Sequence, residues 1–235
     1  MTQPVTFLLW TDIPAEHEAG FNEWYNREHI PDRVFGIPGF IQARRFAAVE
    51  GGPQYATLYE VAGPEVFRNE AYLAMRRTPD PHSQHYIALF RNVIRIVGRP
   101  DADMDAVAVK IRAAGVTEGA WVRFVALKAP AAATAHRLHN AGPALVVDLA
   151  RRPGVVRVRL FSVVPELQEG AVRNMQGTTR AGLRGPDRLA DALLMIEAAT
   201  EAQLAAVEAD ALAACRDWTL LGSARMRQVM RVAAS

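Results

Sequence analysis

The chain has 235 residues, half of them apolar and under a quarter charged, so it is long enough for one large domain or two small ones. The formal net charge is only +2 and no basic stripe is present, which argues against a nucleic-acid-binding protein. The single cysteine, Cys215, excludes an internal disulfide, and its amphipathic surroundings predict a buried structural thiol. No apolar run approaches the roughly 18 residues that span a bilayer, and the N-terminus lacks the basic start of a signal peptide, so we expect a soluble cytoplasmic protein.

The first half predicts strands and helices in the order βαββαβ. The apolar run 5–13 predicts a strand. Residues 15–30 predict a helix that Pro31 ends or kinks, because proline has no N–H and crowds the preceding turn. The sequence EGGP at 50–53 predicts a hairpin. The remaining expected elements are strands at 40–49, 53–62 and 90–98 and a helix at 63–77.

The second half repeats this order. A helix is expected at 133–152, interrupted by the AGP at 141–143, and a second helix at 200–218 with Thr200 as its N-cap. The remaining expected elements are strands at 121–128, 154–164, 191–199 and 224–233.

A faint internal repeat supports this division. IPGFIQARRF at 37–46 matches RPGVVRVRLF at 152–161, a shift of 152 − 37 = 115 residues. FRNVIRIV at 90–97 matches MRQVMRVA at 226–233, a shift of 226 − 90 = 136 residues. The two shifts differ by 136 − 115 = 21 residues, which predicts an insertion in the second half, at 165–188.

Each βαββαβ unit predicts a ferredoxin-like antiparallel sheet with helices on one face only, so the other face needs a partner. A second sheet of the same chain supplies one. We therefore expect an α+β fold with two tandem ferredoxin-like repeats, whose sheets pack into an intrachain α+β barrel with the helices outside. The expected organisation is a first repeat at 1–98, a linker with a short helix at 99–119, and a second, degenerate repeat at 120–235.

The stretch WYNREHIPDRVFGIPGFIQARRF, followed by YATLYEV, resembles EthD-type and related members of the dimeric α+β barrel superfamily. The resemblance covers about residues 5–97 and does not extend to the motif in the second half. The residues that carry it are Trp24, Tyr25, Glu28, His29, Pro31, Pro38, Gly39, Phe40, Arg44, Arg45, Tyr55 and Tyr59.

The resemblance implies the fold more strongly than it implies a reaction. The superfamily contains lactone isomerases, aromatic polyketide cyclases, quinone-forming and haem-degrading monooxygenases, and haem peroxidases. In several members the pocket lies between the sheet and the helices and uses a histidine or tyrosine. If this chain has a site, it is expected in the first half only.

His29 is the first candidate for a catalytic group, because imidazole takes and returns a proton near neutral pH. The alternative is a structural role, in which His29 contacts the carbonyl groups at the end of a helix. Glu28 is expected to orient His29 or to act as a base; alternatively it pairs with Arg44 or Arg45.

The expected substrate-binding residues surround this pair. Trp24 would form an apolar wall, and Tyr25 would contribute a polar group. Tyr55 and Tyr59 share one face of a strand, where they either flank the pocket and stabilise an enolate or belong to the barrel core. Arg45 could bind a carboxylate, or form a structural ion pair.

No metal site is expected. His82 and His85 are three residues apart, but Pro79 and Pro81 indicate a loop there, and no acidic or sulfur ligands cluster beside them in the sequence. No phosphate-binding loop or nucleophile elbow is present. Scattered arginines such as Arg76 are expected to be solvated or paired.

Together these patterns predict a cofactor-independent enzyme that acts on a small, aromatic or lactone-like metabolite by general acid/base proton transfer, as an isomerase, cyclase or lyase. The alternatives are a non-catalytic protein that binds a hydrophobic metabolite or haem, and a haem-dependent monooxygenase-like protein. The expected partner is a small-molecule substrate, with no nucleic acid and no membrane; a homodimer is possible.

Overall fold

The computed structural model describes residues 4–105, 119–164, 166–168 and 186–234. Residues 106–118 of the expected linker helix and most of the expected insertion at 165–188 lie outside this range. The first half contains β1 (Val5–Asp12), α1 (Glu18–Trp24), the π-helical segment η2 (Tyr25–His29), α2 (Ile30–Val34), β2 (Phe40–Gly52), β3 (Tyr55–Val61), α3 (Glu70–Arg77), α4 (Pro81–Leu89) and β4 (Arg91–Asp105). The second half contains β5 (Trp121–Lys128), α6 (Ala132–Ala150), β6 (Val155–Val163), β7 (Arg188–Leu189), β8 (Ala192–Ala198), α8 (Glu201–Ala214) and β9 (Thr219–Ala233).

The two halves form one closed barrel. The strand order is β1-β3-β2-β9-β5-β8-β6-β4-β7, and β1 also pairs with β4, so that every strand except β7 belongs to the ring. Within the ring all pairings are antiparallel. The halves join at two equivalent seams, β2 with β9 and β6 with β4. The expected pair of ferredoxin-like repeats in an intrachain α+β barrel is confirmed, with hydrogen-bonded edges closing it.

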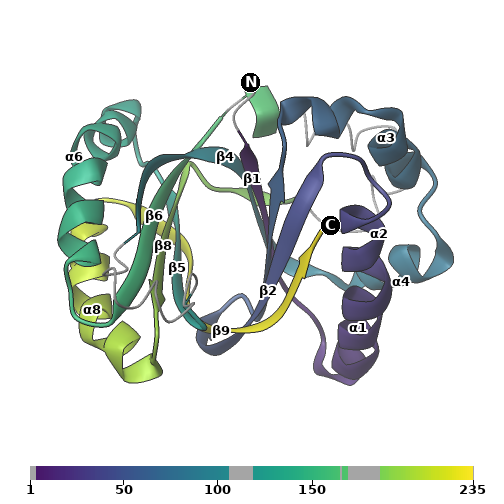
Figure 1. Cartoon of the computed structure of the whole chain (residues 1–235), viewed down its shortest axis with the longest axis horizontal. Helices are drawn as coiled ribbons and strands as arrows, with labels where there is room; N and C mark the ends of the chain where they lie inside the picture. The colour runs from purple at the N-terminus through teal and green to yellow at the C-terminus, as the bar shows by residue number, and fades with distance from the viewer. Residues whose placement is uncertain (1–3, 106–118, 165, 169–185, 235) are drawn as a thin grey trace.

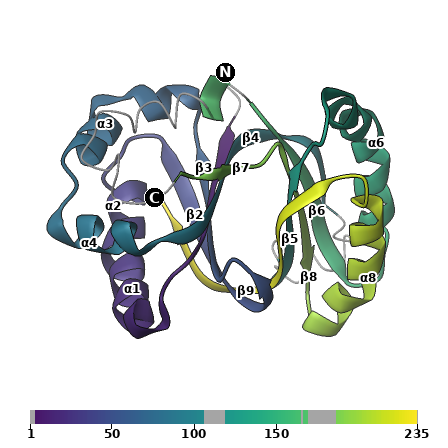
Figure 2. The ribbon, with the colours of Figure 1, turned by 180° about the vertical axis from the view of Figure 1, so that it is seen from behind.

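Helices cover the outside of the barrel on both sides (Figure 1). The first sheet carries α1, α2, α3 and α4, and the second carries α6 and α8; Figure 2 shows the same arrangement from behind. Side chains of each strand alternate between the barrel interior and the helix layer, because successive side chains point to opposite faces. In β1, for example, Leu8 and Trp10 belong to the interior cluster, while Phe7 and Leu9 pack beneath the first-half helices.

Pro31 does not end the first helix. The helix continues as α2 through Val34, after the π-helical segment η2, in which the Ile30 N–H donates to the Tyr25 carbonyl five residues back. The widened turn accommodates a residue that has no N–H to donate. Of the two alternatives expected at Pro31, an end or a kink of the helix, the end at residue 30 was therefore wrong.

The expected loop at Pro79 and Pro81 is shorter than predicted: Pro79 lies in the loop between α3 and α4, but α4 begins at Pro81 and carries His82 and His85. Asp80 caps α4 by accepting a hydrogen bond from the Ser83 N–H at 2.8 Å, and Pro81 occupies the first turn, where its missing N–H costs nothing.

In the second half, α6 runs unbroken through Pro143, against the expected interruption. It lies so close to β6 that a Cβ atom on Gly142 would fall 2.3 Å from Leu160 Cδ2. Thr200 caps α8 as expected.

A chain of charged groups crosses the barrel interior and connects the halves. Both oxygens of Glu197, on β8, accept hydrogen bonds from Arg44 of β2, at 3.1 and 2.9 Å. Arg159 of β6 donates to the same carboxylate at 3.0 Å and to Glu60 of β3 at 3.3 Å. Burial alone would raise the pKa of Glu197, but Arg44 and Arg159 outweigh it and hold this pKa below its ordinary value.

Cys215 is buried, as expected for a structural thiol. Among the described residues, none of the helices is both long and apolar enough to cross a membrane.

Replacing Glu197 by alanine should lower the free energy of unfolding by roughly 3–5 kcal/mol, because Arg44 and Arg159 remain buried without their carboxylate. Since the folded pKa of Glu197 is lowered, the wild-type contribution is present at neutral pH and is lost as the pH falls through that pKa. Glu23→Ala removes only an exposed pair with Arg27 and should cost less than about 1 kcal/mol. Denaturant unfolding of both variants measures the difference; equal losses would contradict the role assigned to Glu197.

Candidate functional site

His29 lies at the end of the π-helical segment and points inward. It is 4% exposed, and its ring lies against two aromatic neighbours, with centroid separations of 4.3 Å to Trp24 and 4.4 Å to Tyr25. Short π-helical segments inside α-helices frequently mark functional sites, because they turn a side chain in a direction that a regular helix cannot. Here the segment places the imidazole in the layer between the first sheet and its helices.

The imidazole lines a cavity of about 40 Å³ in this layer. One water needs about 10–15 Å³ of such space, so the cavity has room for a group of a few heavy atoms. Strands β1, β3 and β4 form its floor, and α2, α3 and α4 form its other walls. The lining residues are Phe7, Leu9, His29, Arg33, Tyr59, Tyr72, Met75, Arg76, Ile87, Phe90 and Arg95.

Three buried guanidinium groups border the cavity. Arg95 pairs with Asp187, which stands just before β7 and comes from the second half of the chain. Arg33 donates to the His29 carbonyl oxygen at 2.6 Å, and Arg76 donates to the Tyr72 hydroxyl at 2.8 Å. The surroundings of His29 are therefore strongly electropositive.

The two tyrosines of the cavity respond differently to this environment. Burial raises the pKa of Tyr59 well above its ordinary value, which keeps that phenol protonated and able to donate a hydrogen bond. Burial alone would also raise the pKa of Tyr72, but the charges of Arg76 and Arg95, together with the hydrogen bond from Arg76, hold it below its ordinary value. The cavity thus stabilises negative charge on an oxygen atom.

Some of the site residues predicted from the sequence line the cavity, and others pack behind the residues that line it. His29 and Tyr59 line it. Trp24 and Tyr25 pack against the imidazole without lining the cavity. The face shared by Tyr55 and Tyr59 looks toward the helices, so these tyrosines do not belong to the barrel interior.

Tyr55 and Arg45 hold the first helix on the sheet. The Tyr55 hydroxyl bonds to Glu18 and accepts from Asn22. Arg45 donates to Asn22 at 2.6 Å and to Asn26 at 2.7 Å. Its guanidinium also lies over the rings of its aromatic neighbours, Phe21, Tyr25 and Tyr55. Neither Tyr55 nor Arg45 lines the cavity with His29.

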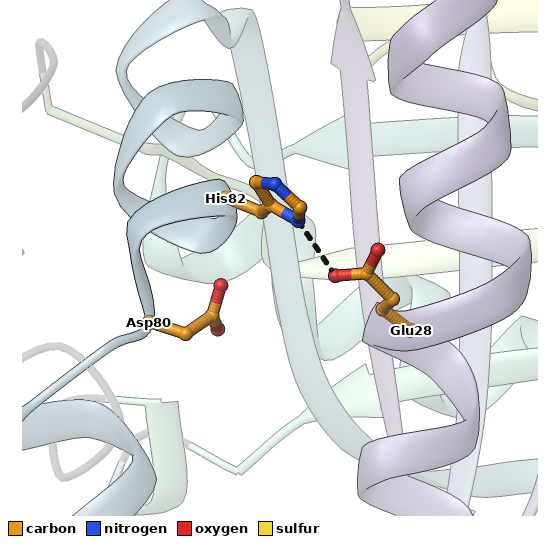
Figure 3. Close-up of side chains that lie close together, drawn as sticks. All are labelled: Glu28, Asp80 and His82. Carbon is orange, nitrogen blue, oxygen red and sulfur yellow. Dashed lines mark hydrogen bonds and ion pairs between the residues drawn. The ribbon is translucent and has the colours of Figure 1, made fainter.

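Glu28 points toward a different neighbour. Its carboxylate lies 3.0 Å from Nδ1 of His82, on α4 (Figure 3). The His82 side chain is exposed, and that of Glu28 is half-buried. It does not pair with Arg44 or Arg45, the expected alternatives; Arg44 binds Glu197. Together with Trp24, Tyr86 and His82 it borders a separate hollow of about 170 Å³.

Donor atoms of Glu28, Asp80 and His82 lie within 4.8 Å of one another, close enough to hold a cation between them. His85 does not join this group, since its ring packs against His17 and Tyr86 at 5.7 and 4.8 Å. Exposed carboxylates of this kind are common without a metal, and the ion pair between Glu28 and His82 already satisfies two of the three side chains.

The sequence did not single out Arg33, Tyr72 or Arg95, and it assigned Arg76 a solvated or paired place. Arg76 is not solvated, since it is 2% exposed; its partner is the hydroxyl of Tyr72. One signal was available for Arg95: it alternates with Ile94 and Ile96 on a strand, so it had to face either the barrel interior or the helix layer. No comparable signal existed for Tyr72 and Arg76, since the pattern of α3 does not show which of its residues reach the sheet.

Comparisons with solved structures show the fold alone. An anthrone oxidase-like protein superposes with a TM-score of 0.66 at 10% identity, covering 100% of this chain and 94% of the other. A protein of Fusobacterium nucleatum named as a candidate monooxygenase superposes at 0.57 and 8% identity, covering 100% and 96%. A chlorite dismutase from Candidatus Nitrospira defluvii, in complex with imidazole, superposes at 0.53 and 8% identity, covering 97% and 91%. These neighbours have the dimeric α+β barrel fold.

No protein-family model matches the chain, and no curated protein matches its sequence.

Arg76→Met should raise the pKa of Tyr72, because the variant removes the nearest positive charge and the hydrogen bond to the phenol while burial remains. In the wild-type protein Tyr72 should ionise at a lower pH than a free tyrosine. A pH titration of the near-ultraviolet tyrosinate absorbance measures this, with Tyr72→Phe used to assign the signal. Arg77→Met alters an exposed neighbour and should leave the titration unchanged; an unshifted Tyr72 in Arg76→Met would contradict the electrostatic account.

Proposed function

We propose that this protein is an enzyme that binds a small metabolite in the first-half cavity and uses His29 as a general acid/base. The observation that carries this proposal is the shared cavity: the imidazole borders the same space as the phenols of Tyr59 and Tyr72 and three guanidinium groups. A proton acceptor beside groups that stabilise an oxyanion is the combination that enolisation requires.

In this mechanism the neutral imidazole of His29 removes a proton from a carbon next to a carbonyl group. The C–H bond breaks, and its electron pair moves onto the carbonyl oxygen, which becomes an enolate oxygen. The protonated phenol of Tyr59 donates a hydrogen bond to that oxygen, and Arg33 and Arg76 stabilise its charge. The imidazolium then returns the proton to the same or another carbon, which completes an isomerisation without an added redox partner.

The other candidates act by positioning. Trp24 and Tyr25 fix the plane of the imidazole, while Tyr55 and Arg45 anchor the helix that carries it. Glu28 does not take part in proton transfer in this proposal, because its carboxylate is directed toward His82. We assign to Glu28 only a role in orienting His29, because the two residues are neighbours in η2.

The reaction class is an isomerisation, cyclisation or lyase reaction on a small aromatic or lactone-like compound. The EthD-like motif around Trp24 and His29 supports a metabolite-acting member of the dimeric α+β barrel proteins. The structural neighbours support the same level of description, since their names include an oxidase, a monooxygenase and a dismutase. A ring larger than the cavity needs its lining to move, and Met75 is the flexible, half-buried side chain suited to do so.

The competing function is that of a binding protein for a hydrophobic metabolite or haem, or of a haem-dependent monooxygenase-like protein. Pockets for drug-sized ligands hold about 300–1,000 Å³. The cavity at His29, at about 40 Å³, does not fit a porphyrin. The proton-transfer function therefore has the better support at this site, and a Soret band in protein purified from cells supplied with haem would favour its rival.

His29→Gln should abolish catalysed exchange of carbon-bound protons while leaving the fold intact. The measurement is hydrogen–deuterium exchange in D₂O, followed by nuclear magnetic resonance, over a panel of small lactones, aromatic ketones and keto acids. We expect at least one panel member to exchange faster with the wild-type protein, and His29→Gln to reduce that rate by about 10²–10⁴-fold, the usual contribution of a general base.

His85→Gln is the matched control, since it removes an exposed histidine whose ring does not line the cavity, and it should exchange at the wild-type rate. Circular dichroism verifies that both variants are folded. Undiminished exchange in His29→Gln would remove His29 from the mechanism, and a panel member that binds without exchanging would favour the binding-protein function.

A further inference from the structure

Two buried positive charges of the cavity form no ion pair in the described part of the chain. Arg33 is 5% exposed and Arg76 is 2% exposed, and neither forms an ion pair there. The charge of Arg33 acts on one neighbouring carboxyl, that of the exposed Asp32, where it opposes the rise in pKa that burial causes. The third guanidinium, on Arg95, is paired with Asp187. Burying an uncompensated charge is costly, and proteins normally pair such groups. The cavity therefore has an excess of positive charge that calls for an anion.

Polar atoms at the same place also lack hydrogen bonds of good geometry. The Nε atom of Arg76 is buried and has no hydrogen-bond partner among the described residues. The hydroxyl of Tyr59 is also buried; it interacts with the hydroxyl of Tyr25 but forms no hydrogen bond of good geometry. Both side chains are at least 98% buried and line the cavity. Buried polar atoms are almost always hydrogen-bonded, so unpaired ones that face a cavity indicate a missing ligand or water.

We propose that the cavity binds a carboxylate group of the substrate, with Arg33 and Arg76 as its charge partners and the Tyr59 hydroxyl as a hydrogen-bond donor. This inference rests on the proposed function and assigns its substrate to the small carboxylic acids. The carboxylate is then itself the carbonyl group next to which His29 removes a proton, so the three groups that bind it in the substrate also stabilise the enediolate that forms. Guanidinium groups suit this ligand, because their donors match the two oxygens of a carboxylate. The volume of about 40 Å³ also matches a group of three or four heavy atoms.

Two other sources could supply the negative charge. One is Tyr72 itself, as a phenolate beside Arg76; the other is an inorganic oxyanion. A tyrosinate would fill the electrostatic need and leave no place for an added anion. The Nε atom of Arg76 would still lack a partner in that case, and the hydroxyl of Tyr59 would still lack a hydrogen bond of good geometry, which is why the structure favours an external carboxylate.

The test uses sodium formate as the probe and sodium nitrite as the inorganic comparison, at equal ionic strength set with sodium chloride. Calorimetric titration of the full chain gives the affinity, and the melting temperature gives a second readout, since a ligand that binds the folded state raises it. We expect formate to bind the wild-type protein. Arg76→Met and Arg33→Met should each weaken that binding by at least tenfold, and two variants guard against one that fails to fold. Arg27→Met, at an exposed arginine, should bind as the wild type does.

The proposal is overturned if formate has no effect beyond chloride, or if Arg76→Met and Arg33→Met bind it as tightly as the wild type. It is also overturned if nitrite binds at least tenfold more tightly than formate, or if the protein shows a Tyr72 phenolate at neutral pH and no formate binding. His29→Gln should retain formate binding. If His29→Gln loses proton exchange and formate does not bind the wild-type protein, the proposed function stands and this inference falls. If formate binds but exchange in His29→Gln is undiminished, this inference stands and the role of His29 falls.

Discussion

The closed barrel depends on the ion pairs that the buried carboxylate of Glu197 forms with Arg44 and Arg159. This carboxylate lies inside the ring and binds Arg44 from the first half and Arg159 from the second, while Arg159 reaches back to Glu60 of the first half. Charges placed in an apolar interior are stable only when each has its partner. The two sheets must therefore close in one register, since a slip of one residue would turn each of these side chains to the opposite face. Closure in turn directs the other face of the first sheet toward its helices, where the cavity lies.

Alternation along β2 shows how one strand serves both layers. Arg44 and Arg45 are neighbours in sequence and are equally buried, at 1% exposure each, yet they have different environments. Arg44 enters the barrel and binds Glu197, whereas Arg45 enters the helix layer and binds two asparagines of the first helix. The position of the helix that carries His29 is therefore connected, through adjacent residues of one strand, to the ion network that closes the barrel.

The sequence predicted the fold well because its signals are local or repeated. Period-two apolar strands and the repeat between residues 37–46 and 152–161 were enough to infer two ferredoxin-like sheets and their barrel. Proline was the misleading signal, since Pro31, Pro81 and Pro143 all belong to helices. A π-helical turn and an N-terminal position accommodate the missing N–H of Pro31 and Pro81, and α6 simply continues through Pro143. The cavity was only partly predictable. His29 and Tyr59 belong to a motif, but Arg76, Arg95 and Asp187 meet there only because the strands and helices are folded together, from places 92 residues apart in the case of the ion pair.

The second half shows that excess positive charge is not a requirement of this fold. Its helix layer also contains buried or half-buried arginines, Arg123 and Arg225, but both reach the carboxylate of Glu208 on α8, at 3.5 and 2.8 Å. The hydrogen bond and charge of Arg225, with the charge of Arg123, hold the pKa of Glu208 below its ordinary value. Arg225 also pairs with Glu201 at 3.2 Å, so these two arginines are matched by two carboxylates. The first half has the same strand order and carries a helix layer of its own, α1 to α4, yet Arg33 and Arg76 form no ion pair there among the residues that the structure describes. Because one repeat stabilises the fold with its charges compensated, the imbalance in the other is better explained by a ligand that arrives from outside.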